Sequence, residues 1–120
     1  MAKFNIIKEK SFGYAVRIVK LYKYLIDNSG DYVISKQLLR CGTSIGANIE
    51  EALGGVSKAD FINKLSIAYK ESRESNYWIR LLYAVEYIDK KMFDSFNHDS
   101  EEISKILYTI IRTTKSGQKN

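Results

Sequence analysis

The stretch CGTSIGANIEEALGG, residues 41–55, combines glycines, hydroxyls and paired carboxylates in the middle of the chain. It is open to three interpretations: a phosphate-binding loop, a catalytic carboxylate site, or a helix that packs very close to a neighbour. A phosphate loop of the familiar form has Lys-Ser or Lys-Thr directly after its last glycine, but Ala47-Asn48 follows Gly46. Gly42 and Gly46 lie one helical turn apart, so we expect them to allow close approach of the helix that follows in the sequence.

The carboxylates support the second interpretation less well. A di-iron site in a helical bundle needs a Glu-x-x-His pair on each of two helices, and the chain has one histidine, His98. Glu51 and Glu74 could still act as general acid and base in a hydrolase, although no nucleophile accompanies them. We prefer a polar network that fixes the register between the second and third helices, made by Asn48, Glu51, Glu71 and Glu74.

Composition limits the class of protein. A chain of 120 residues with 45% hydrophobic and 28% charged residues is expected to form one globular domain over residues 1–120. It has no apolar run long enough for a bilayer and no signal-peptide pattern, so we expect a cytoplasmic protein without membrane contact. The single cysteine, Cys41, is distant from His98, which predicts a buried structural thiol, no metal and no cofactor.

The chain has no proline, and its apolar residues recur at steps of three and four, as on one face of a helix. This pattern predicts an all-α protein, an antiparallel up-and-down four-helix bundle. The expected helices cover residues 11–28, 35–53, 58–88 and 90–115. Residues 1–9 and 116–120 are expected to be loose.

Helix ends and buried faces follow from the same pattern. Gly30 can adopt the left-handed conformation that ends the first helix, Ser57 can cap the third, and Asp89 can cap the fourth. The expected core line of the first helix is Phe12, Ala15, Val19, Tyr22 and Ile26. The expected line of the second is Leu38, Ile45, Ile49 and Ala52.

The net charge of +5 is unevenly distributed. Residues 103–120 contain four basic and no acidic side chains, whereas residues 86–102 contain six acidic and two basic ones. A polyanion would therefore be attracted to the segments near the chain ends.

Two lines of basic residues, each with one tyrosine inserted, could bind phosphates while a base packs against the ring. The stronger candidate is Lys105, Tyr108, Arg112 and Lys115 on the fourth helix. The weaker is Lys70, Arg73, Tyr77 and Arg80 on the third. For both lines the alternative is that the cations only solvate an outward face while Tyr77 and Tyr108 fill a subunit contact, and on the third helix we favour this alternative. Arg17, Lys20 and Lys23 of the first helix would join this surface if the helices are neighbours.

Several short motifs in a fixed order resemble the bacterial four-helix-bundle proteins named after the intervening sequences of 23S ribosomal RNA genes. The similarity covers about residues 11–115. Its motifs are Gln37-Leu-Leu-Arg40, Ser44-Ile45, Asn48-Ile-Glu-Glu51, Phe61, Ile67-Ala68 and Lys70-Glu-Ser-Arg-Glu-Ser-Asn-Tyr-Trp-Ile-Arg-Leu-Leu82. One departure is Ala52, where many members have glycine.

The resemblance implies a four-helix bundle that assembles into a ring, usually of five subunits, with a suspected role in RNA or DNA binding and no enzymatic activity. A related group serves as accessory proteins of reverse transcriptases in diversity-generating retroelements. Independently, the many aromatic residues predict a homo-oligomer, because aromatic side chains are enriched where subunits meet. We therefore expect a non-catalytic oligomer that binds RNA or another nucleic acid and no small-molecule substrate. The alternative is a scaffold that recognises another protein.

Overall fold

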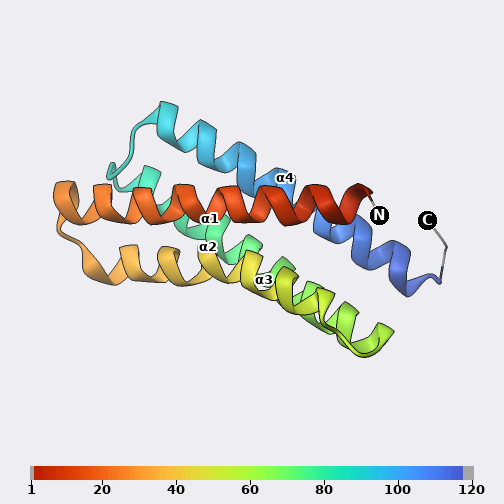
Figure 1. The fold of residues 1–120 in the computed structure, drawn as a ribbon. Coiled ribbons are helices and arrows are strands. Elements are labelled where there is room, and N and C mark those ends of the chain that lie inside the picture. Colours follow the sequence, from red (N-terminus) through yellow and green to blue (C-terminus); the bar gives the residue numbers. More distant parts are fainter. Residues whose placement is uncertain (1, 118–120) are drawn as a thin grey trace.

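The computed structural model describes the backbone of residues 2–117 and the side chains of residues 4–117. In this part of the chain it contains four helices and no strand: α1 (Ala2–Ser29), α2 (Tyr32–Leu53), α3 (Lys58–Ala84) and α4 (Lys90–Lys115). Each helix packs against its neighbours in sequence, and α4 returns to pack against α1. The helices alternate in direction, so α1 begins and α4 ends at the same end of the bundle (Figure 1). The predicted all-α, up-and-down four-helix bundle is confirmed.

The buried face of α1 differs from the predicted one. Its buried residues recur at steps of three and four along the whole helix and are Phe4, Ile7, Ser11, Tyr14, Ile18, Leu21 and Leu25. In the predicted line, Phe12 is 70% exposed and Val19 44% exposed. The error arose because α1 carries two parallel apolar lines, and Ser11 interrupts the one that forms the core. Residues 4–9 are not loose as predicted, because Phe4 and Ile7 anchor the first turns of α1 in the core.

The start of α2 lies three residues before the predicted start at residue 35. Asp31 caps the helix and accepts hydrogen bonds from the backbone nitrogens of Val33 and Ile34, both at 3.0 Å. Gly30, at φ +69°, ends α1 as predicted. The helix α4 covers the predicted range, 90–115, because the Asp89 carboxylate accepts from the backbone nitrogen of Met92 at 2.9 Å.

The end of α3 was predicted at residue 88, but the helix ends at Ala84. Glu86 adopts the left-handed conformation, with φ 65°. The backbone nitrogens of Glu86 and Tyr87 donate to the carbonyls of Tyr83 and Leu82, which is the Schellman motif that commonly ends a helix. Glycine usually occupies the left-handed position, so a glutamate there gives no signal in the sequence.

Gly42 and Gly46 do allow close approach of a helix, but the helix is α1 and not α3 as predicted. A Cβ atom on Gly42 would lie 2.9 Å from Ile18, and one on Gly46 would lie 3.5 Å from Ser11. The predicted core line of α2, Leu38, Ile45, Ile49 and Ala52, is buried as predicted. Spacing along α2 shows which residues share a face, but it does not show which neighbour that face meets.

The contact between α3 and α4 includes several small polar residues that are buried with the apolar core. The hydroxyls of Ser72 and Ser104 share a hydrogen bond of 2.7 Å, and the Asn76 amide donates to Ser100 at 2.7 Å. All four side chains are buried. Since each group has a partner, the burial of these polar atoms is compensated, and the bonds fix the register of α4 along α3.

Candidate nucleic-acid interface

The predicted line on α4 lies on the surface of the bundle. Lys105, Tyr108, Arg112 and Lys115 are all exposed, with Tyr108 at 54%. Among the described side chains, no acidic group lies within ion-pair distance of these three cations. Arg112 and Lys115 lie in the last turn of α4, where they also interact favourably with the negative end of the helix dipole.

The predicted line on α3 divides into two halves. Lys70 and Arg73 are exposed and have no ion pair within residues 4–117. Arg80, by contrast, donates to the Asn76 side chain at 3.1 Å and lies 5.8 Å from the centre of the Tyr77 ring. Tyr77 packs edge-on against Trp78, with ring centres 5.0 Å apart. The first half of this line is therefore free to meet a ligand, and the second half is engaged within the protein.

A groove between α3 and α4 brings the two predicted lines together. Arg73 of α3 and Lys105 of α4 line this groove with Tyr69, Glu101 and Tyr108. The rings of Tyr69 and Tyr108 have centres 6.1 Å apart and planes tilted by 47°. Sequence reasoning missed Tyr69 and Glu101, because their position at this groove depends on the register between the two helices.

The basic residues of α1 do not join this groove. Arg17 donates to Asp99, and also to the Ser95 hydroxyl at 2.7 Å, while its guanidinium lies 4.1 Å from the centre of the Phe96 ring. Since α1 and α4 are antiparallel, Lys20 and Lys23 continue from Arg17 toward the acidic first half of α4 and away from Lys105. Arg17 is therefore engaged with the acidic half of α4, and a role of Arg17, Lys20 and Lys23 in binding nucleic acid stays a prediction.

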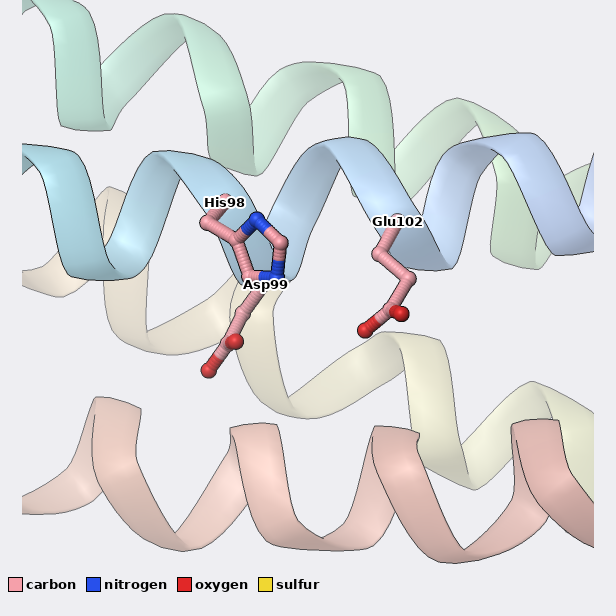
Figure 2. A group of neighbouring side chains, drawn as sticks. All are labelled: His98, Asp99 and Glu102. Carbon is pink, nitrogen blue, oxygen red and sulfur yellow. The ribbon is translucent and has the colours of Figure 1, made fainter.

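His98, Asp99 and Glu102 form the one group within the described residues whose side chains could jointly hold a metal ion. Figure 2 shows both carboxylates reaching from α4 toward α1. There Asp99 pairs with Arg17, and Glu102 accepts from the Lys10 amine at 3.0 Å. Each carboxylate already has a cationic partner, so Asp99 and Glu102 serve as ion-pair contacts between α1 and α4.

The chain is similar to one known protein family over most of its length. Residues 3–109 match the family described as 23S rRNA-intervening sequence protein. The chain belongs to this family. The match covers most of α1 to α4, so it includes both walls of the groove.

This member of the 23S rRNA-intervening sequence family is similar to one protein of solved structure. That protein comes from Bacteroides thetaiotaomicron VPI-5482, has unknown function and is assigned to the S23 ribosomal protein family. The two chains are 55% identical, with a TM-score of 0.90 over 92% of this chain and 99% of the other. No curated protein matches this chain. None of the helices within residues 2–117 has the length and apolar character needed to cross a membrane.

The motifs that suggested the 23S rRNA-intervening sequence family meet between α2 and α3. Arg40 of α2 donates to Glu71 at 3.2 Å and also to Glu74. The indole nitrogen of Trp78 donates to Glu74 at 3.0 Å. Glu71 and Glu74, two members of the predicted polar network, therefore accept hydrogen bonds from Arg40, and Glu74 also accepts one from Trp78.

The rest of the expected network lies elsewhere. Glu51 accepts from Lys64 at 2.7 Å, and the Asn48 amide donates to the Ser44 carbonyl one turn back on α2. Lys64 and Glu74 are ten residues apart on α3, which is about 15 Å along the helix. Glu51 and Glu74 therefore have separate partners at separate levels of the bundle and form no shared catalytic site.

Cys41 is buried, as predicted. Its thiol donates weakly to the Leu38 carbonyl at 3.6 Å. Burial, with a smaller contribution from Glu74, raises the pKa of the thiol to about 12. Since the thiolate is the reactive form, this cysteine is inert near neutral pH.

Proposed function

We propose that this protein is a non-catalytic, cytoplasmic bundle that binds RNA or another nucleic acid through the surface shared by α3 and α4. We name this surface the α3–α4 basic face and define it as Lys70, Arg73, Lys105, Arg112 and Lys115. The observation that carries the proposal is that all five cations are exposed without an acidic partner among the described side chains. A phosphate backbone is the polyanion that such a surface fits best.

The distribution of the remaining charges supports this location. The cations of α1 nearest to α4, Lys10 and Arg17, pair with Glu102 and Asp99, in the acidic half of that helix. Arg40 and Lys64 are likewise engaged with carboxylates. Five of the eleven described cations without an acidic partner therefore lie on the α3–α4 basic face; the other six are Lys20, Lys23, Lys36, Lys58, Arg80 and Lys91. The name of the family, which refers to 23S rRNA, points to RNA as the first nucleic acid to test.

A salt titration tests this function. We expect a labelled RNA to bind with an affinity that falls steeply with added salt, because each phosphate neutralised by a lysine or arginine releases a counterion. Five such contacts would weaken binding by about two orders of magnitude between 50 and 200 mM salt. Undetectable binding at low salt, or affinity that does not change over this range, would refute the proposed function.

We also propose that copies of the chain associate. Phe12, Val16 and Val19 form an apolar line on the outer face of α1, and each is at least 41% exposed. Exposed apolar side chains aligned on one helix are typical of a protein contact. This line also fits the alternative, a scaffold that binds a different protein, so the mass of the purified protein in solution distinguishes the two. The resemblance stated above leads us to expect five subunits.

A further inference from the structure

The groove between α3 and α4 is the only part of the α3–α4 basic face where the described residues place aromatic rings between cations. It has a volume of about 550 Å³, with Arg73 on the α3 wall and Lys105 on the α4 wall. Tyr108 lies beside Lys105 and is half exposed. A surface that binds only the outside of a duplex needs cations but has no use for an exposed ring at this position.

From this arrangement, and resting on the nucleic-acid binding proposed above, we infer that the groove receives an unpaired base of a single-stranded nucleic acid. The base stacks on the exposed face of Tyr108. The phosphates on either side of it pair with Arg73 and Lys105. Stacking of bases on aromatic side chains in a positively charged groove is the usual way in which proteins bind single strands.

The geometry of the two tyrosines shows which ring face is available. A base inserted between two rings needs about 7 Å between parallel planes, since each stacking contact takes about 3.5 Å. The rings of Tyr69 and Tyr108 have centres only 6.1 Å apart and are tilted by 47°. The base therefore stacks on the outer face of Tyr108, while Tyr69 supports that ring from the other side.

The charges of the groove limit where the nucleic-acid backbone can lie. Glu101 lines the same groove, and its carboxylate has no hydrogen bond or ion pair with any described residue. Its carboxylate repels phosphates, so the backbone follows the two cationic walls. In a duplex the base faces are covered by their neighbours in the stack, and Tyr108 would have nothing to bind.

Fluorescence anisotropy with labelled ten-nucleotide probes tests this inference: single-stranded RNA, single-stranded DNA and an RNA duplex. We expect Tyr108→Leu to weaken binding of the preferred single strand by about five-fold or more. Tyr108→Phe retains the ring and should bind within about two-fold of the original protein. Glu101→Gln should strengthen binding by about two- to five-fold, because it removes a repelling charge.

Tyr77→Leu is the matched control, because Tyr77 is also an exposed tyrosine of a basic line, at 49%, but lies outside the groove. It should change single-strand affinity by less than about two-fold. Equal losses for Tyr77→Leu and Tyr108→Leu, or duplex binding as tight as single-strand binding, would overturn the inference while leaving the proposed function standing. Absence of salt-dependent binding to all three probes would remove both. Equally tight binding of an acidic peptide would show that the groove recognises charge alone and would also overturn the inference.

Discussion

A Cβ atom on Gly42 of α2 would lie 2.9 Å from both Cγ1 and Cγ2 of Ile18 on α1. Ile18 is fully buried, and its β-branched side chain has few alternative rotamers. The absence of a side chain at Gly42 therefore sets the distance between the first two helices. The segment that resembled a phosphate loop has a structural role, and the candidate binding residues lie on α3 and α4.

Gly42→Ala should destabilise the protein even though alanine is the better helix former. Overpacking against Ile18 costs about 1–3 kcal/mol, and the gain in helix propensity returns only about 1 kcal/mol. Urea unfolding measures the difference. Gly46→Ala is the matched control, because its Cβ would lie at an ordinary contact distance of 3.5 Å from Ser11. It should be neutral or stabilising by up to about 1 kcal/mol, and equal losses for both variants would contradict this account.

Glu86→Gly should stabilise the protein by about 1 kcal/mol, because Glu86 adopts a positive φ of 65° that glycine adopts without strain. Gly30→Ala should have the opposite effect, with a loss of about 1 kcal/mol, since Gly30 has φ +69° at the end of α1. Thermal or urea unfolding of both variants checks the signs. A loss of stability for Glu86→Gly would show that the glutamate side chain stabilises the turn after α3 by more than its backbone strain.

Stability should fall with rising pH above about 8.5, the pKa of a cysteine in an unfolded chain. Burial raises the pKa of Cys41 to about 12, and burial likewise raises the pKa of Tyr14. Above pH 8.5 the unfolded chain loses the Cys41 proton that the folded protein retains, and above about pH 10 it also loses the Tyr14 proton. Unfolding then becomes more favourable by up to about 1.4 kcal/mol per pH unit for each group. Urea unfolding between pH 8 and 10.5 should show a shallower decline for Cys41→Ala. An identical decline in both proteins would contradict the assignment to this thiol.

Phe12→Glu should reduce the mass of the protein in solution, because it places a charge in the exposed apolar line of α1. Light scattering after size-exclusion chromatography measures this mass. Val33→Glu is the control, since Val33 is 75% exposed on α2 and lies outside that line. If Phe12→Glu leaves the mass unchanged, or if the original protein is already a monomer, the proposed self-association is wrong.

Local signals in the sequence predicted the helices well. Asp89 can only cap a helix that begins at residue 90, and the buried positions of α4 keep steps of three and four from Phe96 through Ser100 to Ile110. The prediction failed at two residues that are uncommon in their positions. Ser11 is a polar residue in the buried line of α1, and Glu86 has the positive φ that glycine usually adopts at the end of a helix.

Contacts between helices could not be predicted in the same way. Whether Gly42 meets α1 or α3, and whether Arg17 pairs with Asp99, depends on how far each helix is shifted and rotated against its neighbour. The groove shows the same limit, because Tyr69 and Tyr108 are brought together only by the register that the Ser72–Ser104 hydrogen bond fixes. The candidate cations were therefore predictable individually, but their grouping was not.

The salt dependence of RNA binding by two paired double variants tests the central claim most directly. Arg112→Gln with Lys115→Gln removes two charges from the α3–α4 basic face, whereas Lys20→Gln with Lys23→Gln removes two from α1 and leaves that face intact. We predict that the first pair weakens binding and lowers the slope of log affinity against log salt by about 1 to 2, while the second pair leaves the slope unchanged. Equal reductions by both pairs would contradict the location of the site, and unchanged binding by the first pair would contradict its role.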